Sequence, residues 1–251
     1  ARMTSAYYQI MKCIAVVMAM ASEASPIVTQ LDAREIPAVP LMPFKFFEAN
    51  HGGCRVIVSV NGSDRRHGVD SIGTEAAALN TYVVARQYNP DLIITAGTAG
   101  GWMHRGAEIG DVYVSDQKFV HHDRRIAIPG FDEYGIGSYP AVPASGLAQA
   151  LNLKLGIVTT SNSLDENDDD RRLIAASGGA VKEMEAAAVA YVGEMLAIPV
   201  MALKAITDLV DHHTATADQF NANLLMASQR LAEKLLQVID FCAPRSVADL
   251  G

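Results

Sequence analysis

The stretch IPVMALKAITDLVDHH (residues 198–213) decides the fold, because an apolar run ends there in a carboxylate. Residues 200–206 are apolar apart from Lys204, which predicts a strand buried on both faces of a sheet. Asp208 follows at the carboxyl end of this strand, where open α/β sheets bind their ligands. A solvated turn residue is the plain alternative. A helix cap is disfavoured, because the next helix signal begins only at Thr216.

Other Val- and Ile-rich runs predict further buried strands, at residues 14–20, 56–60, 92–96, 112–114 and 155–159. Helical stretches separate several of them, at 69–87 and at 184–196, where the apolar residues follow helical spacing. Strands that alternate with helices indicate an α/β fold. We therefore predict one domain over residues 1–251, a three-layer α/β/α sandwich around a mixed, mostly parallel central sheet.

Local signals predict where two helices begin. Ser25-Pro26 is typical of an N-cap followed by proline at the first helical position. Thr216-Ala-Asp-Gln219 matches a capping box and predicts the start of a final helix. The segment 130–144 is rich in Gly, Pro and Tyr, and we expect it to be a long surface loop.

Composition narrows the class of protein. The 251 residues carry a net charge of −8 without Lys/Arg clusters, which disfavours a nucleic-acid partner. Three scattered cysteines, Cys13, Cys54 and Cys242, favour a reducing, cytoplasmic compartment over a disulfide framework. The apolar run 13–21 is too short to cross a membrane. A signal peptide is its alternative interpretation, but we expect a first core strand after a disordered tail at 1–11.

Three further features could line a ligand site with Asp208. Glu23 follows the first strand and lies in the crossover before Ser25, while Glu185 begins an Ala-rich helix. For either carboxylate the plain alternative is a favourable charge at a helix start, a role that Glu183 can also fill. AGTAGG (residues 96–101) predicts a Gly-rich turn that lets backbone approach a ligand, or simply a tight turn.

Together these motifs resemble one family. AMASE (19–23), AGTAGG (96–101), KEMEAAAVA (182–190) and AITDLVD (205–211) are similar to the 5′-methylthioadenosine/S-adenosylhomocysteine nucleosidases of the nucleoside phosphorylase superfamily. HDRRIAIPGFDEYG (122–135) and SLD (163–165) resemble the plant-type branch in particular. The resemblance extends from about residue 14 to 235, with the motifs in the family's order and spacing.

The resemblance implies hydrolysis of the bond between adenine and a 5-thioribose, as in methionine salvage. It implies that Asp208 protonates adenine N7, that Glu23 positions and activates the water, and that Glu185 binds the ribose hydroxyls. The remaining expected substrate-binding residues are Met20, Thr98, Ala99, Gly100, Leu164, Asp165, Glu183, Met184 and Thr207. Lys204, four residues before Asp208 and expected on the same strand face, is interpreted as structural.

The resemblance also implies a homodimer, with no cofactor, metal or membrane, and a nucleoside as the small-molecule ligand. Two alternatives stay open. A phosphorolytic nucleoside phosphorylase would need a cation for phosphate, which Arg65, Arg66, Arg124 or Arg125 could supply. A non-catalytic storage protein of the same fold would not need the three acids, all of which this chain has. Whether S-adenosylhomocysteine is accepted depends on the 5′ pocket, which the sequence does not define.

Overall fold

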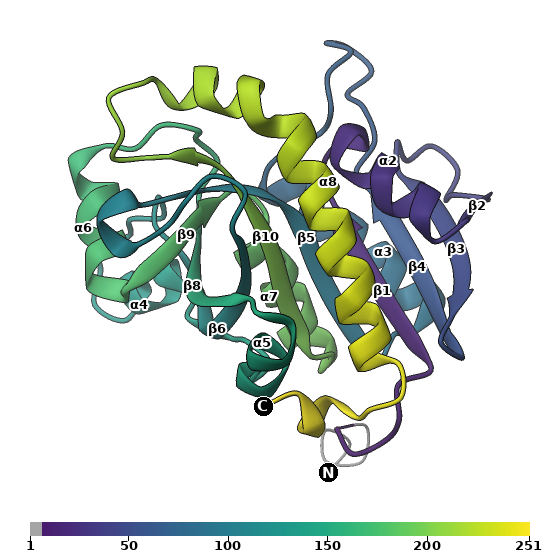
Figure 1. The fold of residues 1–251 in the computed structure, drawn as a ribbon. Helices are drawn as coiled ribbons and strands as arrows, with labels where there is room; N and C mark the ends of the chain where they lie inside the picture. The colour runs from purple at the N-terminus through teal and green to yellow at the C-terminus, as the bar shows by residue number, and fades with distance from the viewer. Residues whose placement is uncertain (1–6) are drawn as a thin grey trace.

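The structure is a computed structural model and describes residues 7–251 (Figure 1). The predicted disordered tail at 1–11 lies partly outside this range. Within residues 7–11, Tyr8 and Ile10 are exposed, but two backbone contacts hold the chain: the Tyr7 carbonyl accepts a hydrogen bond from Ala248 N, and Met11 N donates one to the Arg245 carbonyl, both at 3.0 Å. Met11 is also buried. This correction has a long-range cause, because the covering segment comes from the other end of the chain.

One mixed sheet runs through the described residues. Its strands are β1 (Cys13–Met18), β2 (Arg34–Ile36), β3 (Lys45–His51), β4 (Cys54–Val60), β5 (Leu92–Gly101), β6 (Val112–His121), β7 (Tyr139–Pro140), β8 (Lys154–Thr160), β9 (Gly179–Glu183) and β10 (Val200–Leu209). The order is β10-β6-β8-β9-β5-β1-β4-β3-β2, with β7 on β6 and an additional β10–β5 pairing. That pairing closes β5, β9, β8, β6 and β10 into a ring.

The predicted mixed, mostly parallel sheet is confirmed: parallel and antiparallel strand pairs are equally frequent among the described strands, but the parallel pairs join more residues and include the central run β4-β1-β5-β10. β1–β4, β1–β5, β5–β10, β6–β8 and β8–β9 are parallel. β6–β10, β2–β3, β3–β4, β5–β9 and β6–β7 are antiparallel. No clear signal in the sequence predicted β2, β3, β7 and β9, because these strands are short or only partly apolar.

Helices cover both faces of the sheet, which confirms the predicted layers (Figure 1). α2 (Ala21–Gln30) and α8 (Thr216–Cys242) pack on one face, and α3 (Thr74–Tyr88) and α7 (Ala186–Leu196) on the other. Ile14 and Val16 of β1 join the core under α2 and α8, whereas Ala15 and Val17 join the core under α3 and α7. This alternation explains why β1 is apolar at every position.

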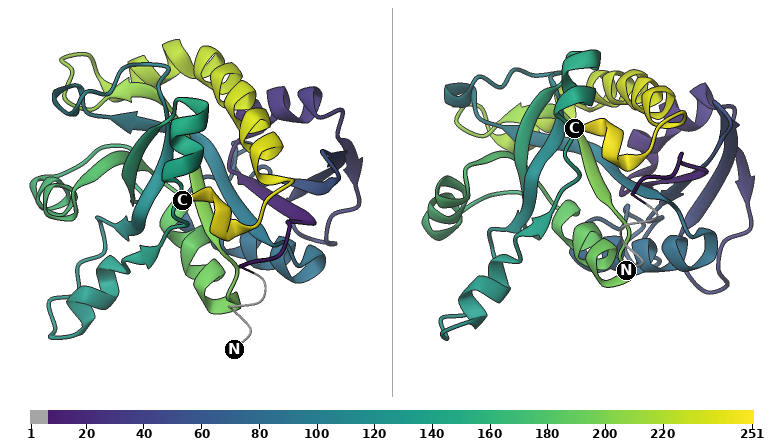
Figure 2. Two further views of the ribbon diagram at one scale, coloured as in Figure 1. Left: turned by 60° about the horizontal axis from the view of Figure 1, so that its bottom comes forward. Right: turned by 90° about the horizontal axis from the view of Figure 1, so that it is seen from below.

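Shorter elements complete the chain: α4 (Phe131–Ile136), α5 (Ser145–Leu151), α6 (Asp168–Ser177) and the 3₁₀ turns η1 (Met103–Arg105) and η2 (Val247–Leu250). The predicted loop at 130–144 therefore contains α4 and β7. Figure 2 shows the α4 segment standing clear of the sheet and the large helices. Within the described residues, no helix is both long and apolar enough to cross a membrane.

Of the two predicted helix starts, the one at Thr216 is confirmed, whereas the one at Ser25-Pro26 and the capping box at Thr216 need correction. α2 begins at Ala21, so Pro26 lies inside the helix and Ser25 is not its N-cap. α8 does begin at Thr216, but its N-cap is Ala215 and no side chain caps it. Gln219 does not form the expected capping box, because its side chain binds the backbone of Leu209 and Thr214.

Two further expectations differ from the structure. The helix predicted at 69–87 begins only at Thr74, after Gly73, whose φ of 98° is in the left-handed region. The Gly-rich stretch 96–101 is no turn but the second half of β5, paired with β10 throughout and with β9 at its end. Glycines suit these strand positions because the side chains of Asp208 and Ala107 approach the backbone so closely that a Cβ would collide with them.

Candidate active site

A cavity of about 400 Å³ opens where the carboxyl ends of β1, β5 and β10 meet. Its lining consists of Ala19, Met20, Glu23, Ile72, Thr98, Ala99, Gly100, Ser163, Leu164, Lys182, Glu183, Met184, Glu185, Thr207, Asp208, Thr216 and Phe220. Every site residue expected from the sequence is in this set except Asp165. The size suits a nucleoside, and the position is the one that α/β sheets use for ligands.

Asp208 lies inside β10, next to an irregularity in the strand. Ile206 pairs with Ala99 and Asp208 pairs with Gly100, so Thr207 is an inserted bulge residue. The bulge reverses the alternation of faces, so the spacing to Lys204 does not put the two side chains on one face, contrary to the prediction. The Thr207 hydroxyl donates to Asp208 Oδ1 at 2.8 Å.

Gly100 makes room for the Asp208 carboxyl. A Cβ at this position would stand 2.6 Å from Asp208 Oδ2, closer than side-chain carbons pack. Asp208 is 3% exposed, and burial raises its pKa, against the lowering effects of the Thr207 hydrogen bond and the charge of Lys182. Asp208 therefore holds a proton more readily than an exposed aspartate does.

Glu23 lies in the first turn of α2, not in the crossover before the helix as expected. Thr98 donates twice to Glu23 Oε1, from its backbone N at 2.7 Å and its hydroxyl at 2.6 Å. Burial raises the pKa of Glu23, whereas the Thr98 hydrogen bonds and the charge of Lys204 oppose this shift. The carboxylate is thus held in a fixed orientation at the cavity wall.

The third predicted acid, Glu185, is the N-cap residue of α7, and its Oε1 accepts a hydrogen bond from Gly73 N at 2.8 Å. Burial, followed by the negative charge of Glu183, raises the pKa of Glu185 to about 7. Gly73 is the one donor to the Glu185 side chain among residues 7–251, so this carboxyl group keeps oxygen lone pairs that can accept hydrogen bonds from a ligand.

Glu183 lines the cavity, but other groups occupy its oxygens. It accepts hydrogen bonds from Ala186 N at 2.9 and 3.0 Å, from Glu185 N at 3.0 Å and from the Thr160 hydroxyl. Lys204 Nζ lies 2.8 Å from Glu183 Oε2. The geometry gives Glu183 the task of capping α7 and holding Lys204.

Lys204 is the residue whose importance the sequence understated. Its ammonium is buried beside Glu183, and an added Cβ on Gly97 would lie 3.4 Å from the Glu23 oxygens and 3.5 Å from Lys204 Nζ. Burial alone would lower the pKa of Lys204, but the negative charges of Glu183 and Glu185 raise it. A lone lysine in an apolar strand was the available signal, since a buried lysine needs a charged partner.

Five further residues line the cavity that the sequence analysis did not predict: Ile72, Ser163, Lys182, Thr216 and Phe220. Lys182 begins the motif KEMEAAAVA, but nothing in the local sequence separates the other four from ordinary core or loop residues. In the structure, Lys182 Nζ donates to the Leu164 carbonyl. This contact links β9 to the loop that carries the expected adenine-binding backbone.

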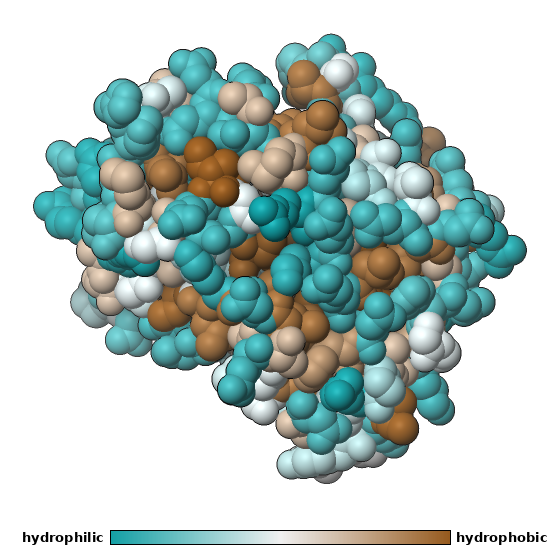
Figure 3. Space-filling view, in the orientation of Figure 1, coloured by the Kyte–Doolittle hydropathy of each residue, from teal (hydrophilic) through white to brown (hydrophobic). Residues whose placement is uncertain are grey.

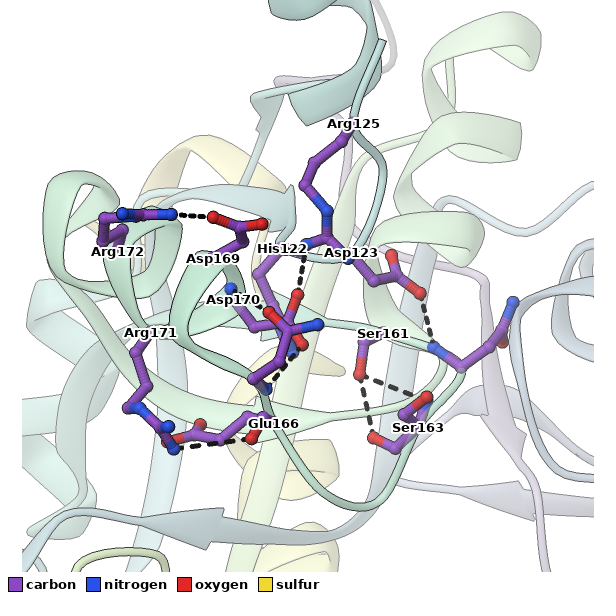
Figure 4. A network of polar contacts seen from close by, with 12 residues as sticks. His122, Asp123, Arg125, Ser161, Ser163, Glu166, Asp169, Asp170, Arg171 and Arg172 are labelled. Atoms are coloured by element: carbon purple, nitrogen blue, oxygen red, sulfur yellow. Dashed lines mark hydrogen bonds and ion pairs between the residues drawn. The ribbon is translucent and has the colours of Figure 1, made fainter.

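That loop, residues 161–167, is held by a polar network on its outer side (Figure 4). Arg125, in the segment after β6, contacts Asp170 at the start of α6, and Asp123 accepts a hydrogen bond from Asn162 N at 2.8 Å. These contacts occupy Arg125, and Arg65 donates to the Leu41 carbonyl. Neither arginine lines the cavity, nor does Arg66 or Arg124.

No group of three or more His, Cys, Asp or Glu side chains within residues 7–251 is arranged to hold a metal ion. The arrangement offers instead two buried carboxyl groups, Asp208 and Glu23, and a third, Glu185, around one cavity. Such a set can donate a proton to one part of a bound molecule, position a water against another part and bind hydroxyl groups.

The family model described as the phosphorylase superfamily matches residues 13–240, so the chain belongs to this superfamily. Within it, the chain is 43% identical over 238 residues to a 5′-methylthioadenosine nucleosidase of Arabidopsis thaliana, covering 93% of this chain and 88% of the relative. It is 38% identical to a 5′-methylthioadenosine/S-adenosylhomocysteine nucleosidase of the same plant, covering 94% of each.

The solved structure of the Arabidopsis thaliana 5′-methylthioadenosine nucleosidase in its apo form superposes on this fold with a TM-score of 0.94. It is 40% identical in sequence, and the match covers 96% of this chain and 100% of that one. The resemblance to plant-type nucleosidases, which the sequence motifs indicated, is confirmed.

Gly100→Ala tests the close approach of Asp208. Because an alanine Cβ would meet Asp208 Oδ2, the carboxyl group must move, and we expect kcat to fall about 10²-fold. Gly97→Ala is the matched control on the same strand, since its Cβ makes contacts of 3.4 Å or more and should cause a much smaller loss. Steady-state kinetics measures kcat for both variants, and circular dichroism checks that both are folded. Equal kcat values in the two would contradict the assigned role of Gly100.

Proposed function

We propose that this protein hydrolyses the N-glycosidic bond of 5′-methylthioadenosine and releases adenine and 5-methylthioribose. The observation that carries the proposal is the pairing of Asp208 and Glu23 in one nucleoside-sized cavity, each with its own hydrogen-bond donors. The relatives named above act on 5′-methylthioadenosine or on that compound and S-adenosylhomocysteine. S-Adenosylhomocysteine is accordingly a second proposed substrate.

Adenine is a poor leaving group as an anion, so one group must protonate N7 as the bond breaks, an effect of about 10² to 10⁴ in rate. Asp208 fits this task better than Glu23. A single hydroxyl donates to Asp208, whereas two Thr98 donors and the charge of Lys204 favour the ionised form of Glu23. Asp208 therefore holds the proton, and ionised Glu23 positions and deprotonates the attacking water.

The remaining lining residues fit the other parts of the substrate. Glu185 accepts hydrogen bonds from the 2′- and 3′-hydroxyls, and Met20 and Met184 pack on the sugar. Leu164 covers one face of adenine, while the backbone near Asp165 binds the edge of the base. Thr98, Ala99 and Gly100 line the side of the water and the ribose, and Thr207 orients Asp208.

A phosphorolytic reaction is the second candidate, and the charges disfavour it. Phosphate would have to bind beside Glu23 and Glu185, and both carboxylates would repel it. None of the four arginines that could have supplied a cation lines the cavity. A non-catalytic storage role is disfavoured because the three acids are not only present but converge on one site.

The reaction type is tested by adenine release from 5′-methylthioadenosine in phosphate-free buffer, repeated with added phosphate and with S-adenosylhomocysteine. We expect release at the same rate in both buffers, with free 5-methylthioribose as the product, because Glu23 selects water over phosphate. Release that depends on phosphate and yields a sugar 1-phosphate would establish the phosphorylase instead. No release under any of these conditions would favour the storage role.

The roles of the two carboxyl groups are separated by leaving-group chemistry. 4-Nitrophenyl 5-methylthioriboside needs no proton on its leaving group, so Asp208→Asn should abolish turnover of 5′-methylthioadenosine but spare this substrate. Glu23→Gln should be nearly inactive on both substrates, because the water is activated in either reaction. Loss of both activities in Asp208→Asn would contradict its role as the acid.

The same pair of substrates gives a pH test. A raised pKa keeps Asp208 protonated until the pH rises through that value, so kcat/KM for 5′-methylthioadenosine should fall on the alkaline side. This fall should be missing with the nitrophenyl riboside. Both substrates should lose kcat/KM below a pH of about 7, where Glu185 becomes protonated.

We also propose that the protein is a homodimer of the cytoplasm, acting in methionine salvage. Large apolar side chains are exposed on α3 and α7, which pack together, and on the projecting α4 segment (Figure 2). They are Leu79, Tyr82, Ile128, Phe131, Tyr134, Tyr191 and Met195. The face that carries α8 mixes hydrophilic and hydrophobic residues without one continuous apolar surface (Figure 3). A second copy is therefore expected on the α3/α7 side.

Sedimentation equilibrium tests this proposal with the wild-type chain and the double variant Leu79→Asp/Met195→Asp. We expect a dimeric wild type and a monomeric variant, because charges placed within an apolar interface oppose association. Leu225→Asp, on the exposed side of α8, is the matched control and should stay dimeric. A monomeric wild type would refute the dimer.

A further inference from the structure

Two amide side chains of α8 hold the backbone of β10 on both sides of Asp208. Gln219 Oε1 accepts a hydrogen bond from Leu209 N at 3.0 Å, and its Nε2 donates to the Leu209 carbonyl at 3.1 Å. Asn223 Nδ2 donates to the Thr207 carbonyl at 2.9 Å. Residues 207 and 209 are thus each bound by a side chain from the same helix, and the acid lies between them.

The strand needs these contacts because it loses a neighbour there. β6 pairs with β10 only at Leu203–Ala205, and the segment 110–111 continues the contact to Ile206. Beyond that point the edge of β10 has no strand partner among the described residues. A buried backbone without partners would be unfavourable, so the amides replace the missing ladder at the position of the bulge.

Gln219 and Asn223 are four residues apart and therefore lie on one face of α8. They are also coupled, because Asn223 Nδ2 donates to the Gln219 carbonyl at 2.9 Å. Gln219 Nε2 donates in addition to the Thr214 carbonyl at 2.8 Å, which fixes the loop between β10 and α8. Gln219 is buried, so water does not compete for these bonds.

We propose that Gln219 and Asn223 are positioning residues that hold Asp208 in its proton-donating position. This inference rests on the proposed function, in which Asp208 is the general acid. Gln219 and Asn223 act only through the backbone at 207 and 209 and through the bulge that directs the carboxyl group. A displacement of about 1 Å can lower a catalytic rate about 10²-fold, so a backbone clamp at this place affects proton transfer.

The test compares Gln219→Ala and Asn223→Ala with the wild type on 5′-methylthioadenosine and on 4-nitrophenyl 5-methylthioriboside. We expect kcat for the nucleoside to fall about tenfold or more, with little change in KM, because binding groups stay in place. Turnover of the nitrophenyl riboside should change little, since that reaction needs no acid. A purely structural role would lower both activities together.

Asn221→Ala is the matched control, because Asn221 is an exposed asparagine on the same helix. It should resemble the wild type on both substrates. If the alanine variants fail to fold, Gln219→Met and Asn223→Asp take their place in the test. These two substitutions remove the donated hydrogen bonds at nearly constant side-chain volume. Circular dichroism monitors folding throughout.

Each outcome separates the inference from the proposed function. A wild type that does not release adenine refutes the function itself. A wild type that does so, with Gln219 and Asn223 variants of unchanged nucleoside turnover, refutes only the positioning role. Equal losses on the two substrates also refute it, because they indicate general damage to the site.

Discussion

The site depends on one buried positive charge, the Lys204 ammonium, which lies among the carboxyl groups of Glu183, Glu185 and Glu23. Three carboxylates in one dry cavity repel one another, and each would take up a proton if nothing opposed the repulsion. Lys204 pairs with Glu183 directly, and its charge opposes the burial that raises the pKa of Glu23 and Glu185. Because both partners of the ion pair are buried, removing either would leave an uncompensated charge. The same Glu183 ends β9 and caps α7, so the ion pair connects β10 to both elements.

Much of the framework could be predicted from the sequence. Continuous apolar runs identified β1, β4, β5 and β10, because a strand covered on both faces has no polar positions to interrupt its signal. The position of Asp208 at a strand end, together with the family motifs, identified the acids. Asp208, Glu23 and Glu185 do converge on one cavity. Asp208 and Glu23 converge because β1, β5 and β10 are parallel and their carboxyl ends meet at one edge of the sheet. Glu185 reaches the same cavity from the end of β9, which is antiparallel to β5.

What the sequence did not predict depends on contacts between distant residues. The bulge at Thr207 arises from pairing with β5, and no property of residues 206–208 alone reveals it. Gln219 matched a capping box by its spacing from Thr216, but its side-chain amide binds the backbone of Leu209 and Thr214 instead. Likewise, AGTAGG has the composition of a turn. Its glycines serve a strand instead, because the carboxyl groups of Glu23 and Asp208 lie where side chains would have been.

At the Thr207 bulge, regular strand pairing and the required direction of the Asp208 side chain exclude each other. A β10 without the extra residue would continue an unbroken ladder with β5, which is the more regular way to pair two strands. It would then turn residue 208 to the other face, away from its place beside Gly100. Substitutions that straighten this strand would therefore be selected against even where they make the fold more robust. Thermostable variants of this protein are better sought in the outer helices than in the last three residues of β10.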